Sequence, residues 1–165
     1  MAFERLNAGG NNKFPLTNYG ASSVQDLAHY GASVGCDNQD IYKLEFIAEV
    51  GKAVAASEYE SSMVAVLPAG YIVESVKVDA LTTFAGGVSN DLEVGIAKKA
   101  DGTGADADAL YTGTPTVGTS ESGVLVSPAD EVLLEDYFVT IGTSDATAGK
   151  AKVVVQLRSA LADVS

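Results

Sequence analysis

Apolar and polar side chains alternate along several stretches of this chain, most clearly near its C-terminal end. Polar residues at positions 150, 152, 156 and 158 alternate with the apolar residues Ala151, Val153, Val155 and Leu157. Successive side chains of a β-strand point to opposite faces of its sheet, so a period of two predicts a strand with one buried face. Similar alternation occurs in residues 42–50, 75–80, 91–96 and 137–141.

A short phrase that occurs twice indicates how some of these strands are joined. Val-Ala-Val-Leu-Pro-Ala-Gly at 64–70 is echoed by Val-Leu-Val-Ser-Pro-Ala-Asp at 124–130. Proline presets a turn and cannot donate to a strand ladder, so each copy predicts a strand, a turn and a further strand. The further strands are expected over 71–81 and 132–141. We therefore expect similar turns at corresponding places in two halves of one fold.

Together these segments predict seven or eight strands with turn residues between them and almost no helix. The expected fold is all-β, an antiparallel β-sandwich of jelly-roll or Greek-key type. A closed barrel is the alternative, whereas a parallel sheet would need helical crossovers that the sequence does not show. Residues 53–62 fit either a loop or a helical turn. Residues 101–123 predict a long irregular excursion with a short strand near 109–111.

Residues 1–40 differ in character from residues 41–165, and we expect an N-terminal arm followed by one β-sandwich domain. Turn-forming residues fill positions 7–12, and no Lys or Arg occurs from position 14 to position 42. A short helix fits residues 22–31, with Ser22 or Ser23 as its N-cap and Gly31 at its end. An arm of this length either packs on its own domain or lies across a neighbour.

The formal net charge of −12 argues against partners that are themselves negatively charged. Nucleic acid is bound through Lys and Arg, and so are anionic membrane surfaces, so neither is an expected partner. Nine acidic residues and no Lys, Arg or His occur from position 100 to position 149. This stretch is either a solvated acidic face or a surface that meets a metal or a basic partner.

Cysteine usage and hydropathy favour a chain that is made and folded in a cytosol. The single cysteine, Cys36, excludes an intrachain disulfide. The first residues form no apolar signal region, and the longest apolar run, 63–73, is too short to span a bilayer.

No arrangement of residues indicates an enzyme, so we expect no catalytic residue and no cofactor. The only histidine is His29, Cys36 has no basic residue nearby, and nucleophile and phosphate-loop motifs are missing. Asp101, Asp106 and Asp108 lie in an oxygen-rich, Gly-containing loop of the kind that calcium favours, but they lack the regular calcium-loop spacing. A solvated loop tip is the favoured interpretation there. A glycosidase-type carboxylate pair stays open among 22 acidic residues, although the chain has no Trp for a sugar platform.

One stretch of about a fifth of the chain resembles tailed-bacteriophage structural proteins. It consists of Leu-Pro-Ala-Gly-Tyr-Ile-Val-Glu-Ser-Val-Lys-Val at 67–78, Thr-Phe-Ala-Gly-Gly at 83–87 and Leu-Glu-Val-Gly-Ile-Ala at 92–97. In that family a Pro-Ala-Gly turn leads into a strand, a Phe-Gly-Gly-type turn and a strand that ends in Val-Gly. The resemblance is to small capsid decoration (cement) proteins and related head accessory proteins.

The resemblance implies a non-enzymatic virion protein, made in the host cytoplasm, that binds the outer capsid surface. Such a protein stabilises the shell by bridging neighbouring subunits of the major capsid protein. A homotrimer is favoured, with a homodimer as the alternative. The arm would then contact a neighbour through apolar residues, or the same residues would pack on their own sandwich: Phe3, Phe14, Pro15, Leu16 and Tyr19.

Two other roles stay open. One is a tail or head-fibre accessory protein, which would usually be longer and carry fibrous repeats that are missing here. The other is a carbohydrate- or calcium-binding β-sandwich module, for which the candidate ligands are the three aspartates of the 101–108 loop.

Overall fold

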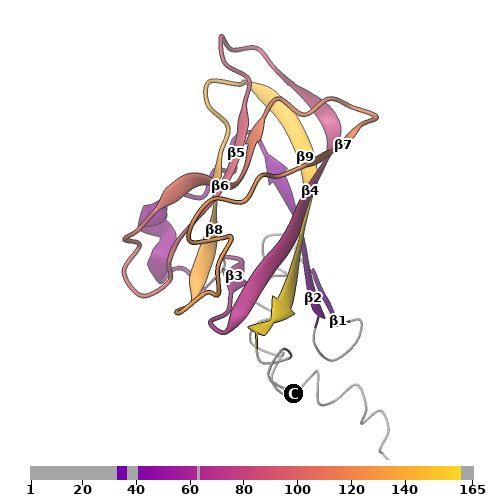
Figure 1. Ribbon diagram of the computed structural model, residues 1–165. Helices are drawn as coiled ribbons and strands as arrows, with labels where there is room; N and C mark the ends of the chain where they lie inside the picture. The colour runs from indigo at the N-terminus through magenta and orange to yellow at the C-terminus, as the bar shows by residue number, and fades with distance from the viewer. Residues whose placement is uncertain (1–32, 37–40, 63, 161–165) are drawn as a thin grey trace, which may run out of the picture.

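The computed structural model describes residues 33–36, 41–62 and 64–160, which form an all-β fold of two antiparallel sheets that face each other (Figure 1). The larger sheet has five strands in the order β1-β2-β9-β4-β7, and the smaller has four in the order β3-β8-β5-β6. The predicted antiparallel all-β architecture is thus confirmed.

Strand lengths differ widely between and within the sheets. The larger sheet contains β1 (Ser33–Cys36), β2 (Ile41–Glu49), β4 (Tyr71–Ala85), β7 (Ser120–Ser122) and β9 (Ala148–Ser159). The smaller contains β3 (Val66–Leu67), β5 (Leu92–Lys98), β6 (Asp106–Gly113) and β8 (Tyr137–Gly142). One short 3-10 helix, η1 (Ala56–Glu60), lies between β2 and β3 in the chain.

Strand pairing is nested along the chain. β2 pairs with β9, β3 with β8, β4 with β7 and β5 with β6, each in antiparallel register. The chain from β2 to β9 therefore runs like one long hairpin whose innermost connection joins β5 to β6. Two further pairings, β4 with β9 and β5 with β8, join the folded ribbon into two sheets.

The core lies between the sheets, and the predicted alternation supplies much of it. In β2 and β9 every second side chain points inward and is buried, while the intervening ones reach the outer surface, and β4 follows this pattern except where its register against β9 shifts. Each buried Val, Leu or Phe contributes about 1.5–3 kcal/mol of hydrophobic stabilisation. The inward side chains of these three strands are Leu44, Phe46, Ala48, Val73, Val76, Val78, Ala80, Phe84, Ala151, Val153, Val155 and Leu157.

The smaller sheet is also covered on its outside, which the sequence pattern did not predict. The first five residues of β8 are all buried, so this strand has no solvent face. The segment around η1 contacts β5 and is fastened by Lys99, whose Nζ donates to the carbonyl oxygens of Tyr59 (2.9 Å) and Ser61 (2.7 Å). The 53–62 stretch, left open between a loop and a helical turn, thus contains a 3-10 turn.

The first copy of the repeated phrase lies against the residues that follow the second copy. Gly70 N donates to the carbonyl oxygen of Leu133 (2.7 Å), and Leu133 N donates to that of Tyr71 (2.8 Å). Ala69 N also donates to Oδ1 of Asp136 (2.9 Å). This adjacency follows from the nesting, because β3 pairs with β8 and β4 with β7, so the β3–β4 and β7–β8 connections lie at the same end.

Several boundaries differ from those expected. Residues 124–126 form no strand, and after the second turn regular pairing starts only at Tyr137, because residues 123–133 cross between the two sheets instead of extending either one. The predicted excursion at 101–123 contains β6 and β7, so nearly half of it is strand. β4 continues through Phe84 and Ala85, which we expected in a loop. Within the predicted arm, the structure describes β1, which pairs with β2 (Ser33 opposite Glu45).

Candidate interaction surfaces

The outer side of the five-stranded sheet is a mixed-charge surface, here called the charged face. Its side chains are the outward ones of β2, β4 and β9, together with Lys52 just after β2. Their inward neighbours fill the core, and charged and polar groups occupy most of these outward positions. The charged face comprises Lys43, Glu45, Ile47, Glu49, Lys52, Glu74, Ser75, Lys77, Asp79, Lys150, Lys152, Val154, Gln156 and Arg158.

Strand register places opposite charges side by side on this face. Glu45 Oε2 lies 3.3 Å from Lys152 Nζ and 3.4 Å from Lys43 Nζ. The hydrogen bond from Lys152 lowers the pKa of Glu45, against an opposing effect of burial. Glu49 lies 2.8 Å from Lys52 Nζ and 3.8 Å from Lys150 Nζ, and the hydrogen bond from Lys52 lowers its pKa in the same way.

Charge is unevenly divided between this face and the rest of the described surface. Of the eight Lys and Arg residues within the described ranges, six belong to the charged face, where they meet four carboxylates. The remaining described surface carries Lys98 and Lys99 against thirteen carboxylates. The charged face is therefore the part of the described molecule where an acidic partner meets the least repulsion.

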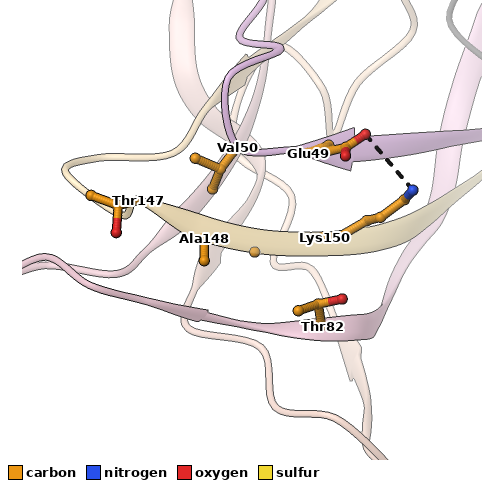
Figure 2. Close-up of a pocket in the computed structure, with 7 residues that line it drawn as sticks. Glu49, Val50, Thr82, Thr147, Ala148 and Lys150 are labelled. Atoms are coloured by element: carbon orange, nitrogen blue, oxygen red, sulfur yellow. Dashed lines mark ion pairs between the residues drawn. The ribbon is translucent and has the colours of Figure 1, made fainter.

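A shallow groove of about 280 Å³ lies at one end of the charged face (Figure 2). It forms where β4 shifts register against β9 on either side of Thr82. Figure 2 shows Glu49 and Lys150 directed toward each other along its upper edge, with the Thr82 hydroxyl on the neighbouring strand. Its walls combine these groups with Val50, Thr147, Ala148 and Gly149, so it extends the polar character of the face.

A second surface lies on the segment that joins β7 to β8. Gly123 N donates to Val76 O of β4 (2.9 Å) and Val126 N donates to Ala109 O of β6 (3.0 Å), so the segment crosses from one sheet to the other. In Figure 1 it is the orange chain that runs in front of the gap between the sheets. Four of its apolar side chains are exposed, here called the apolar strip: Val124 (79%), Val126 (45%), Val132 (39%) and Leu134 (87%).

The sequence did not single out either surface, although signals for both were present. Basic residues gather at the outward positions of three strands and are missing from 100–149, which indicates a polarised molecule. The apolar strip is harder to find, because Val124 and Val126 belong to the repeated phrase and were expected to form a strand. Only the crossing path of the segment turns them outward.

The aspartates proposed as weak calcium ligands are placed on and beside β6. Asp101 Oδ1 accepts hydrogen bonds from N (2.9 Å) and Oγ1 (2.7 Å) of Thr103, and these bonds lower its pKa. Asp106 and Asp108 lie close together, and their hydrogen bond raises the pKa of Asp106. Within the described ranges, no three His, Cys, Asp or Glu side chains gather as a metal site would require.

The other candidate residues lie outside the described part of the chain. These are the arm residues Phe3, Phe14, Pro15, Leu16 and Tyr19, together with His29. Cys36 is the last residue of β1. Among the helices that the structure describes, none is long and apolar enough to cross a membrane.

Comparison with known proteins gives no family. No family model matches the sequence, and no curated protein matches it. Among solved structures, the chain is similar to one from the acid-stable capsid of Helicobacter pylori bacteriophage KHP30, with 10% identity, a TM-score of 0.49, and coverage of 78% of this chain and 94% of the other. It is also similar to one from the capsid of Ralstonia phage GP4, with 15% identity, a TM-score of 0.48, and coverage of 79% and 94%. Likenesses at this level do not establish a family or a role.

Proposed function

We propose that this protein is a structural protein of a phage virion, that its β-sandwich is a jelly roll, and that it binds the outer capsid surface. There it stabilises the shell by bridging neighbouring subunits of the major capsid protein. The observation that carries the proposal is the nested strand pairing.

Nested pairing supports the jelly-roll part of the proposal. Without the edge strand β1, the sheets have the orders β2-β9-β4-β7 and β3-β8-β5-β6, four strands each. A ribbon of four nested antiparallel pairs, rolled into two facing sheets, is the arrangement that two Greek keys make in a jelly roll. Viral capsid domains use this architecture, as do lectins and cupins, so the fold narrows the role without deciding it.

The phage-like phrase supports the virion part of the proposal. Its three pieces fall on consecutive elements: the end of β3 with the β3–β4 turn and the first half of β4, the end of β4 with the start of the β4–β5 turn, and β5. In the decoration proteins that the phrase resembles, the same order of turn and strand occurs. The likeness therefore extends over a continuous structural unit and not over scattered residues.

Stabilisation of the shell would follow from binding alone. A protein that binds the assembled shell and not its free subunits shifts the equilibrium toward assembly by mass action. Contacts with two neighbouring subunits at once raise the effective concentration of the second contact. In an oligomer of this chain, the N-terminal arm of each copy would supply one such contact.

The proposal is tested by mixing the purified protein with shells that lack it and recording cryo-electron micrographs. Ordered density at symmetry-related positions on the outer surface is the expected result, with a rise in the temperature at which the shells open. Shells without added density and with an unchanged opening temperature would contradict the proposal. If the protein is a compact monomer that does not bind shells, the alternative role of a β-sandwich binding module is favoured.

A further inference from the structure

We infer that the two surfaces bind each other between copies of this chain: the apolar strip of one copy lies on the charged face of the next. Both surfaces are present on every molecule, and they complement each other in polarity and in charge. The inference rests on one part of the proposed function, namely that several copies of the chain associate.

The apolar strip has an apolar centre and an acidic rim. Asp108 of β6 lies one residue from Ala109, to which the strip is hydrogen-bonded, and Asp130 and Glu131 lie on the turn between Val126 and Val132. Asp130 and Glu131 are exposed and make no ion pair with described residues. Because no Lys, Arg or His occurs from 100 to 149, this stretch of chain supplies no cation to neutralise that rim.

Backbone hydrogen bonds hold the strip in place before any partner binds. Val126 N is bonded to β6, and Leu133 N is bonded to the carbonyl oxygen of Tyr71 (2.8 Å). Between them, Ala129 and Leu133 are buried in the core. The exposed valines therefore sit on a pre-ordered segment, and little conformational entropy is lost when a partner covers them.

The charged face carries an excess of positive charge, six Lys and Arg against four carboxylates, around a similar centre. Ile47 and Val154 are half-buried in the middle of the face, with Lys152 opposite Ile47 and with Glu45 and Lys77 on either side of Val154. Lys77 is exposed and makes no ion pair with any described residue, so its charge is available to an incoming carboxylate. An apolar centre with a polar rim is the usual anatomy of a protein interface.

A contact between two different surfaces is heterologous, so each copy uses its strip on one neighbour and its face on the other. Such contacts close into a ring when the rotation between copies divides a full turn, and otherwise grow into a filament. A homotrimer of the kind expected for a decoration protein is one such ring.

Charge-reversal variants of the full chain test this contact by solution mass. One variant reverses the face (Lys77→Glu with Lys152→Glu) and the other reverses the strip rim (Asp130→Lys with Glu131→Lys). Wild type is expected to self-associate, with an affinity that falls on the order of tenfold when salt is raised. Each variant alone is expected to be monomeric, and an equimolar mixture should form a complex of one copy of each. The chain that carries all four substitutions should self-associate again.

Two controls distinguish loss of the contact from unfolding and from a change in net charge. Thermal unfolding of each variant shows that loss of association is not loss of folding. Glu58→Lys with Glu60→Lys on η1 changes the net charge by the same amount as the rim variant but away from both surfaces, and it should leave the solution mass unchanged. A monomeric wild type, an unaffected reversal variant or a mixture that stays monomeric would overturn the inference. Shell binding is measured in a separate experiment. If the chain self-associates but does not bind shells, the proposed function is contradicted and the inferred contact between copies is not.

Discussion

Two glycines of the phage-like phrase lie where any side chain would collide with a neighbouring segment. Gly86 adopts a positive φ of 97°, and a Cβ there would collide with Thr147 of the β8–β9 turn. Gly95 lies in the middle of β5, where a Cβ would collide with the backbone of Asp106 and Ala107 in β6. The register between β5 and β6 shifts at this point, because β6 approaches too closely for any side chain.

Replacement of Gly95 by alanine is expected to destabilise the fold by about 2 kcal/mol or more, because the clash is with backbone that cannot rotate away. Gly142→Ala is the matched control at another strand position. Its Cβ would meet Oε2 of Glu93 at 3.1 Å, the far end of a flexible side chain. Urea unfolding should show a change within about 0.5 kcal/mol for the control. Equal effects of the two substitutions would contradict the close approach of β6.

Two adjacent leucines separate the core role of the β7–β8 segment from its surface role. Leu133 is 1% exposed and Leu134 is 87% exposed. Leu133→Ala is expected to lower the free energy of unfolding by about 2–5 kcal/mol, since it leaves a cavity. Leu134→Ala should change it by less than about 0.5 kcal/mol in the monomer. Thermal melting at low protein concentration checks both. A mild effect at Leu133 would mean that the segment does not close the core.

At the scale of elements, the long strands could be predicted from sequence and the connections could not. β2, β5 and β9 have one or both faces in the core, so a period of two or a continuous apolar run identifies them. β7 is three residues long, and its placement depends on pairing with β4 rather than on its own Ser-Glu-Ser sequence.

The positions of the charged face and the apolar strip could not be predicted from the sequence either. The outward lysines and glutamates of β2 and β9 could be recognised as one face of a sheet. That they form the outer surface of the same sheet depends on the pairing of β2 with β9, about a hundred residues apart in the chain. The exposure of Val124 and Val126 follows only from the crossing path of their segment. Long-range pairing of this kind carries no local sequence signal.

Ion pairs on the charged face should make stability depend on acid pH. Glu45 has a lowered pKa in the folded state, so its contribution is present above the ordinary carboxyl value of 4.5 and is lost as the pH falls through the lower folded value. Glu45→Gln should therefore cost a few tenths to about 1 kcal/mol at neutral pH. This difference from wild type should vanish by about pH 3.

Urea unfolding at a series of pH values measures that difference directly. Glu60→Gln on η1 is the control, because Glu60 makes no ion pair with the described residues and loses the same charge. A difference between wild type and Glu45→Gln that persists at low pH would show that the substitution acts through packing and not through charge.

The whole molecule is strongly polarised, and this bears on how it assembles. With a net charge of −12, copies repel one another unless a less acidic surface is turned toward the neighbour. The charged face is such a surface, and it lies opposite the sheet that η1 covers. β1 (Ser33–Cys36), with which the described part of the chain begins, is the edge strand of the same sheet.

Truncation of the N-terminus should separate folding from shell binding at a defined residue. Every described strand lies after residue 32, so a chain that starts at residue 33 is expected to fold with an unchanged melting temperature. If the arm bridges neighbouring subunits as proposed, shell occupancy should fall sharply. A chain that starts at residue 41 also lacks β1, which leaves the edge of β2 unpaired by β1 and should promote aggregation. Occupancy is measured by quantitative gel analysis of washed shells. Full occupancy by the shorter truncation would remove the arm from the binding mechanism, and equal aggregation of both chains would contradict the role of β1 as the edge strand.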